Sequence, residues 1–217
     1  AIAGPKTLEH LVDAVLTLEG DTHQTARILR ATKNRFGPTD EVAVFEMNAQ
    51  GLVPVEQPSA YFLSQRSSAP GSVVTATLEG SRVFLVEIQA LVVSSVFPSP
   101  IRRASGFDER RLLMLLAILS KHGGVRLSEQ DVYVNVVGGL TVDEPSADLA
   151  VIAAVAEACG VARIPENAIF FGEVGLGGEV RRVPGQERRE KEAKRYGFTT
   201  VIGPGTTTTI RDVLKKS

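Results

Sequence analysis

The sequence of 217 residues contains one cysteine, no tryptophan and only three histidines. A single cysteine, Cys159, excludes a disulfide framework and a structural zinc site within this chain, and no other metal site is predicted. There is no signal peptide and no apolar run long enough to span a membrane, which predicts a cytoplasmic protein with no membrane partner. With a net charge of −1, the chain as a whole is not basic enough to attract nucleic acid, so binding of nucleic acid would need a local patch of basic residues.

The chain also lacks the G-x-x-x-x-G-K-[ST] loop that cradles nucleotide phosphates, and it shows no internal repeat. No cofactor is therefore predicted to bind within these residues. The composition, 43% hydrophobic and 23% charged, is ordinary for a globular protein that builds a hydrophobic core.

The most informative stretch runs from a predicted strand to a predicted helix. Apolar side chains alternate in Val132–Val137, two glycines follow, and residues 147–159 are apolar on nearly every side, as in a helix buried at the centre of a domain. Pro145 suits the first turn of that helix. Ser146 is therefore expected at the helix N-terminus.

Two roles are open to Ser146. Serine is common at helix starts because its hydroxyl accepts hydrogen bonds from otherwise unpaired backbone N–H groups. The same position, at the positive end of the helix dipole, could also activate a nucleophile beside an oxyanion site. No activating base lies nearby in the sequence, and on chemistry alone the capping role is favoured.

The residues before this stretch read as a small sheet followed by a boundary. Residues 13–19, 27–32 and 41–47 are predicted strands within an incomplete N-terminal unit, 1–57. A polar, turn-rich segment, 58–71, is predicted to be a linker.

The remaining residues, 72–217, form the predicted second domain. A strand pair is expected at 72–79 and 82–93, a helix at 108–119, and a charged helix at 186–196. Antiparallel pairs mixed with crossover helices predict an α+β, or mixed α/β, domain.

Clustered basic residues are the candidates for a phosphate-binding surface. On the charged helix they recur at i, i+3 and i+7 and share one stripe, although i,i+4 pairs such as Glu187–Lys191 also suit an ordinary solvated helix. Aromatic residues do not interleave with them, so binding through phosphates without base readout is expected. The DNA-binding candidates are Arg102, Arg103, Arg110, Arg111, Arg188, Lys191 and Arg195.

The Pro145–Ala147 segment, preceded by two glycines and Asp143, resembles the nucleophile region of the Lon protease proteolytic domain. The similarity continues through the Gly172–Val180 run. An alignment without gaps places Glu187 where Lon has its catalytic lysine, and Asp148 replaces a glycine. Since a carboxylate cannot serve as the neutral amine of a Ser–Lys dyad, Ser146 and Glu187 are interpreted as degenerate catalytic positions, and no catalytic residue is predicted.

A resemblance covering the whole chain is to the bacterial RadA (Sms) family of DNA repair ATPases. It is carried by the KNRFG motif, by residues 85–90 and by the FGEVGLGGEV run at 171–180. The resemblance implies a C-terminal fragment in which the closing strands of a RecA-like ATPase core precede a Lon-like domain. The motif residues, which would act on the nucleotide of a neighbouring subunit, are Lys33, Asn34, Arg35, Phe36 and Gly37.

The family also implies partners and cofactors. The parent protein would be a DNA-dependent ATPase using ATP and Mg²⁺ in DNA repair and recombination, with DNA, a homo-hexameric ring and other recombination proteins as partners. The leading hypothesis is a non-proteolytic Lon-like module for ring assembly and phosphate-mediated DNA binding. The alternatives are a serine peptidase using Ser146, or a purely structural hexamerisation domain.

Overall fold

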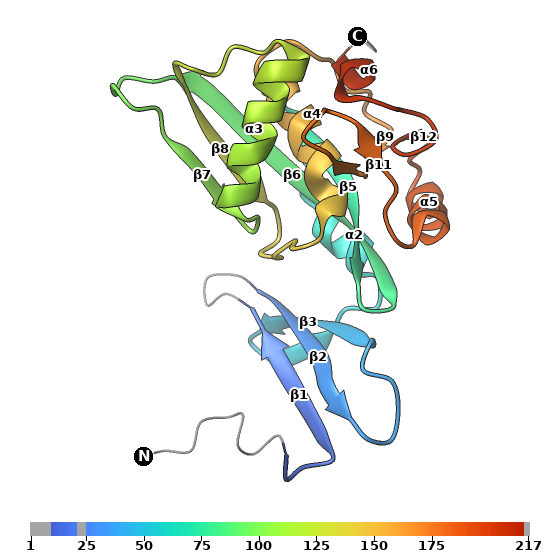
Figure 1. The fold of residues 1–217 in the computed structure, drawn as a ribbon. Helices are drawn as coiled ribbons and strands as arrows, with labels where there is room; N and C mark the ends of the chain where they lie inside the picture. The colour runs from blue at the N-terminus through green and yellow to red at the C-terminus, as the bar shows by residue number, and fades with distance from the viewer. Residues whose placement is uncertain (1–9, 21–24, 215–217) are drawn as a thin grey trace.

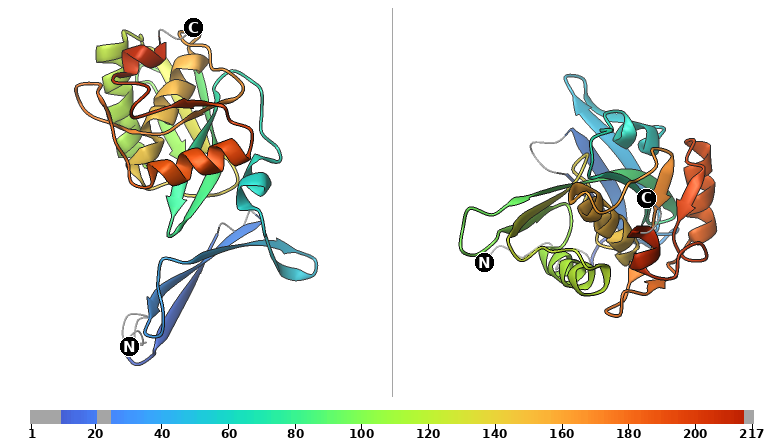
Figure 2. Two further views of the ribbon diagram at one scale, coloured as in Figure 1. Left: turned by 90° about the vertical axis from the view of Figure 1, so that its right-hand side faces the viewer. Right: turned by 90° about the horizontal axis from the view of Figure 1, so that it is seen from above.

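The computed structural model describes residues 10–20 and 25–214. Helices are interspersed with strands along the chain, and the strands pair in both parallel and antiparallel directions. This arrangement confirms the predicted mixed α/β, or α+β, class. A four-stranded N-terminal sheet lies below a larger layered domain in Figure 1 and in the left view of Figure 2. Within the described ranges, no helix combines the length and the hydrophobicity needed to cross a bilayer.

The N-terminal sheet is an antiparallel meander in which each strand pairs with the next. Ala26, Ile28, Val42 and Val44 alternate with more exposed residues and bury one face of the sheet. The sequence predicted the first three strands, whereas the short fourth strand was not expected. The strands are β1 (Ala14–Glu19), β2 (Ala26–Asn34), β3 (Val42–Asn48) and β4 (Gly51–Pro54).

The segment predicted as a linker contains helix α2, Pro58–Leu63. Pro58 occupies the first turn, where its missing N–H has no partner to lose. Phe62 is buried, with its ring centroid 6.0 Å from that of Phe84. Residues 58–63 are thus packed structure belonging to the second domain.

A six-stranded mixed sheet forms the centre of the second domain, in the order β12-β9-β5-β6-β8-β7. The antiparallel pairs β5–β6 and β6–β8 lie in the middle, and parallel pairs complete both sides. The strands are β5 (Ser72–Glu79), β6 (Arg82–Ser94), β7 (Arg102–Ser105), β8 (Gln130–Val136), β9 (Ala168–Phe170) and β12 (Thr200–Ile202).

Helices cover the two faces of this sheet unequally. Helix α4 (Asp148–Ala158) is buried on nearly every side, as its sequence predicted, and packs with α3 (Glu109–Gly123) on one face. Helix α5 (Gln186–Arg195) covers the other face over β5, β9 and the start of β6, where Ala193 belongs to one hydrophobic cluster with Val74, Leu85 and Ile169. The smaller elements are η1 (Pro145–Ala147), β10 (Glu173–Val174), β11 (Val180–Arg181) and α6 (Ile210–Leu214).

Polar contacts and a shared hydrophobic cluster join the N-terminal sheet to the second domain. The Arg30 guanidinium lies 2.5 Å from the Glu79 carboxylate. The backbone N–H of Ser81 donates to the carbonyl of Asp40 at 2.5 Å. Gly80 makes this approach possible, since its φ of +57° suits glycine and a Cβ there would collide with the same carbonyl.

Candidate functional site

Ser146 lies in η1, immediately before α4, where the sequence placed it. The prediction that its hydroxyl caps the helix is wrong, because neither η1 nor α4 receives a side-chain cap. The Ser146 Oγ instead donates to Glu144 Oε1 at 2.6 Å. Only 1% of Ser146 is exposed, so the hydroxyl has no open path to solvent.

The cation that faces Ser146 is Arg189 of α5, a residue that is completely buried. Its Nη1 donates to Ser146 Oγ at 3.1 Å and to Glu144 Oε1 at 2.8 Å, while Nη2 donates to Glu144 Oε2 at 2.7 Å. Its Nε donates to the carbonyl of Pro184 at 3.0 Å, and Nη1 also donates to the carbonyl of Ala76. The guanidinium therefore links α5, β5 and the segment that enters α4.

Glu144 is held in its ionised form by this network. Burial on its own would raise the pKa of Glu144, but the hydrogen bonds from Arg189 and Ser146 outweigh burial and place the pKa below its ordinary value. The backbone N–H of Leu78 adds a further hydrogen bond at 2.6 Å. An ionised carboxylate and a guanidinium thus surround the serine hydroxyl.

This arrangement does not activate a nucleophile. An arginine side chain keeps its proton at all ordinary pH values, so Arg189 cannot accept the hydroxyl proton as the amine of a Ser–Lys dyad would. Glu144 accepts a hydrogen bond from Ser146, yet its lowered pKa makes it a weak base. Burial of the hydroxyl also excludes a substrate carbonyl from approach.

Glu187, the residue that the ungapped alignment placed at the position of the Lon lysine, is exposed in the first turn of α5. Its side chain lines a shallow hollow at the start of that helix, together with Arg182 and Arg188. The residue that meets Ser146 in space is Arg189, two positions further along. Among the residues of α5, the one that contacts Ser146 is therefore the basic Arg189 and not the acidic Glu187.

The buried Asp148 and the part-buried Arg111 form a second ion pair close by. Arg111 Nε donates to Asp148 Oδ1 at 2.9 Å, its Nη2 donates to Oδ2, and the backbone N–H of Val174 donates to Oδ2 at 3.0 Å. Burial raises the pKa of Asp148 above its ordinary value, although Arg111 and Val174 oppose that shift. Arg111 is thus engaged inside the domain and is a poor candidate for DNA contact.

The two arginine pairs predicted to bind DNA do not act as pairs. Arg102 donates to the carbonyls of Pro100 and Leu127, each at 2.8 Å, and is part-buried. Arg103 lies on the opposite side of β7, 68% exposed and 3.3 Å from Glu109. Arg110 is exposed at the start of α3. Only Arg103 and Arg110 remain accessible from these pairs.

The stripe on α5 is accessible over its whole length. Arg188, Lys191 and Arg195 are all exposed, on the side of the helix away from the buried Arg189 and Ala193. Arg188 Nη1 donates to the carbonyl of Ser81 at 3.0 Å, and Arg195 lies 3.9 Å from Glu192. These contacts at the surface leave the charges facing solvent.

The KNRFG motif lies where β2 ends and a turn begins. Asn34 Oδ1 accepts from the backbone N–H of Phe36 at 3.1 Å, and its Nδ2 donates to the carbonyl of Pro38 at 3.3 Å. Arg35 is 75% exposed in its side chain and 3.2 Å from Asp13. Phe36 is also exposed, with Gly37 following it in the turn, so Asn34 shapes a turn that presents Arg35 and Phe36 outward. Lys33, one residue before, is half-buried.

Sequence reasoning missed Glu144 and Arg189. A signal for Arg189 was available, since it precedes Ala193 by four positions and therefore shares the helix face of that small apolar residue. Glu144 offered no comparable signal, because its partner is 45 positions away in the chain.

No model of a known protein family matches the chain. Individual proteins do. The chain is 49% identical over 204 residues to "DNA repair protein RadA" of Aquifex aeolicus, covering 94% of this chain and 46% of that protein. It is 51% identical over 205 residues to "DNA repair protein RadA" of Pseudomonas aeruginosa, covering 94% and 45%.

The protein of the same name from Bacillus subtilis is 49% identical over 205 residues, with 94% of this chain and 45% of that protein covered. The chain thus spans less than half the length of the curated relatives that it matches. Similarity at this level over nearly the whole chain establishes homology to this part of those proteins.

Proposed function

We propose, on the premise that this chain is homologous to DNA repair proteins called RadA, that it is a non-proteolytic, Lon-like module of a DNA repair and recombination ATPase. In this proposal the module assembles into a ring and binds DNA through its phosphates, independently of base sequence. ATP and Mg²⁺ would bind in a part of the parent protein outside this chain, because the chain has no phosphate-binding loop sequence.

The absence of peptidase activity is supported by the surroundings of Ser146. Its hydroxyl is buried, it contacts a guanidinium that cannot accept its proton, and it donates to a carboxylate with a lowered pKa. Nothing in this geometry favours the alternative of a serine peptidase over a polar network that holds the fold together.

The observation that carries the DNA-binding proposal is the row of exposed cations on α5. Arg188, Lys191 and Arg195 occupy one helix face, and Arg182 borders the same hollow as Arg188. Within the part of the chain that the structure describes, Arg182 has no hydrogen-bond or ion-pair partner. Phosphate contacts of this kind position a nucleic acid without reading its sequence.

A titration of DNA binding against salt concentration tests this proposal. Each duplex phosphate neutralised contributes about −0.9 to the log–log slope, so four cations predict a slope of about −3.6. Replacing Arg188 and Lys191 by alanine should weaken binding and reduce the magnitude of the slope by about 1.8. Fluorescence anisotropy with a labelled duplex of arbitrary sequence measures both quantities.

Arg126→Ala is the matched control, because Arg126 is an exposed arginine in the loop after α3 and lies outside the row on α5. It should leave the affinity and the slope nearly unchanged. An equal loss of affinity in Arg126→Ala would mean that binding follows net charge alone. No binding by the wild-type chain at low salt would reject the DNA-binding proposal.

The KNRFG motif supports the ATPase part of the proposal. Its exposed Arg35, held at a turn shaped by Asn34, could reach the nucleotide of a neighbouring subunit as an arginine finger does. Lys33 would contribute charge at the same strand end. In this arrangement the motif acts only within an assembly.

A further inference from the structure

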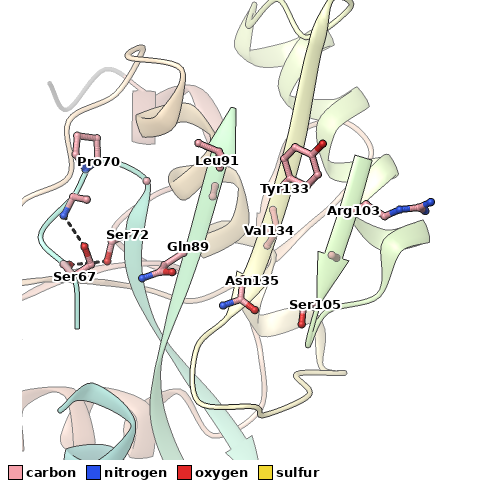
Figure 3. A pocket seen from close by; sticks show the side chains of 14 residues that line it. Ser67, Pro70, Ser72, Gln89, Leu91, Arg103, Ser105, Tyr133, Val134 and Asn135 are labelled. Carbon is pink, nitrogen blue, oxygen red and sulfur yellow. Dashed lines mark hydrogen bonds between the residues drawn. The ribbon is translucent and has the colours of Figure 1, made fainter. Parts of the chain in front are cut away.

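Half of one face of the central sheet carries no helix. Side chains of β6, β8 and β7 that point away from α3 and α4 form two cross-strand rows on this half. The strand register places Leu91 opposite Tyr133 and Tyr133 opposite Arg103, and it places Gln89 opposite Asn135 and Asn135 opposite Ser105. Figure 3 shows these residues on three neighbouring strands, and we name this surface the open sheet face.

The open sheet face is hollowed and largely apolar. A pocket of about 490 Å³ lies between the two rows and the loop at 67–72. Leu91 is 56% exposed, and Val93, two residues along the same strand, is 41% exposed. Contiguous apolar surface of this kind usually marks a protein contact when it is found on a soluble domain.

Helix α3 carries apolar residues on both of its sides. Its inner side buries Leu112, Leu115 and Leu119 in the core. Its outer side exposes Leu113, Met114 and Ala117, which lie at helical spacing on one face, with Leu113 49% and Met114 41% exposed. Because the inner side of α3 already packs on its own domain, this second apolar side is available to cover another surface.

These two surfaces lie on opposite sides of the same domain. Ala90, Val92 and Ala104 pack toward the core beneath α3 and α4, whereas Leu91 and Tyr133 alternate with their neighbours and point the other way. Arg103 alternates with Ala104 on the edge strand β7, but its guanidinium lies 3.3 Å from Glu109, the first residue of α3. Different patches on opposite sides of one chain produce a heterologous, head-to-tail contact between identical copies, which can close into a ring.

We infer that the outer side of α3 in one copy docks into the open sheet face of the next copy. The inference rests on the ring assembly in the proposed function and names the two surfaces that would make it. Helix-on-sheet packing is a stable way to cover both, and Leu113 and Met114 would fill the pocket beside Leu91 and Tyr133.

A second copy fits the open sheet face better than a nucleic acid does. Arg103 is the one cation among the residues lining the pocket, and it is already 3.3 Å from Glu109. DNA would require several cations to neutralise successive phosphates. The exposed leucine and valine, by contrast, lose unfavourable contact with water when an apolar helix covers them.

Paired variants test the contact and its head-to-tail geometry. Leu91→Glu places a charge on the open sheet face and leaves the outer side of α3 unchanged. Met114→Glu places a charge on the outer side of α3 and leaves the open sheet face unchanged. Each variant alone should lose assembly in analytical ultracentrifugation, with the dissociation constant raised about 30-fold, as for a buried hot-spot residue. An equimolar mixture retains one intact contact and should give a heterodimer of twice the 23.2 kDa chain mass.

The mixture also separates a folding defect from a lost contact, because an unfolded variant would form no heterodimer. Leu176→Glu is the matched control: Leu176 is exposed and apolar but lies on neither surface, so assembly should persist. If the wild type and each of the two variants on its own all assemble, the inference is overturned, whereas the ring proposal remains.

A wild-type chain that stays monomeric at all concentrations would overturn the inference and the ring proposal together. Loss of DNA binding in Leu91→Glu with normal assembly would also overturn the inference, because it would identify the open sheet face as a nucleic-acid surface. A mixture that stays monomeric while the wild type assembles, with both variants unfolding at the temperature of the wild type, would exclude the head-to-tail geometry.

Discussion

Replacing Arg189 by methionine should destabilise the chain by about 3 kcal/mol. Arg189 is fully buried, and it donates hydrogen bonds to Glu144, Ser146 and the carbonyls of Pro184 and Ala76. Breaking one side of a buried pair costs about 3–5 kcal/mol because an uncompensated charge remains. The lower end applies here, since the Glu144 side chain is 22% exposed and retains hydrogen bonds from Ser146 and Leu78.

Removing the other partner should cost more. Glu144→Gln leaves the Arg189 charge without a counter-ion in a site with no solvent exposure, which places this variant nearer 5 kcal/mol. For a chain of this length, 1 kcal/mol lowers the melting temperature by about 2–4 °C. Arg189→Met should then melt about 6–12 °C below the wild type, and Glu144→Gln lower still.

Thermal and urea unfolding of both single variants and the double variant would measure these values. The double variant should be less destabilised than the sum of the two single changes, because each change removes the charge that the other leaves unpaired. Additive effects, or a shift below about 2 °C for Arg189→Met, would refute the argument that the pair acts as a buried unit.

The same pair predicts a dependence on pH. The pKa of Glu144 in the folded chain lies below its ordinary value of 4.5, so its stabilising contribution is complete above that pH. The contribution is lost as pH falls through the lower folded pKa. The stability difference between wild type and Glu144→Gln should therefore shrink below about pH 4.5, and a constant difference would contradict this assignment.

Two further outcomes follow from the site and the motif. A fluorophosphonate should label neither the wild-type chain nor Arg189→Lys, because Glu144 would keep the lysine protonated; stoichiometric labelling lost in Ser146→Ala would falsify this prediction. In the parent protein, Arg35→Ala should reduce ATP turnover by about 10³-fold or more if Arg35 acts as an arginine finger, and Lys33→Ala should also lower it. Wild-type turnover in both variants, with normal assembly, would identify these residues as ordinary surface charges.

Strong periodicity made the core predictable from the sequence. Alternating apolar residues predicted the strand that is β8, with one side facing the core. The uniformly apolar run predicted the helix α4, which is buried on nearly every side. Helix α2 was read as a linker because Pro58 and Ser59 are turn residues, yet proline in the first turn begins the helix and Ser59 accepts from the backbone of Leu85 at 3.2 Å. Local composition could not reveal that distant partner.

The candidate site was less predictable, because its members come from distant parts of the chain. Ser146 was identified from its position before α4, but the alignment without gaps directed attention to Glu187, at the position of the Lon lysine, and not to Arg189. A shift of two positions on a helix turns a side chain from solvent to the core, which separates Glu187 from Arg189. Adjacent arginines on a strand point to opposite sides, so Arg102 and Arg103 could never have formed one patch.

Arg189 also connects the buried site to the proposed DNA surface, since the same helix carries both. Its fork of donors fixes the inner side of α5 to β5 and Glu144, while Arg188, Lys191 and Arg195 occupy the outer side. Arg189→Met should therefore weaken DNA binding by loosening the helix without removing a phosphate contact. At temperatures below its melting range, the Arg189→Met variant should bind DNA more weakly than the wild type, with a log–log salt slope close to that of the wild type. Lys191→Ala should lower both the affinity for DNA and the magnitude of the salt slope. A slope reduced by about 0.9 in Arg189→Met would show instead that its charge reaches the DNA directly.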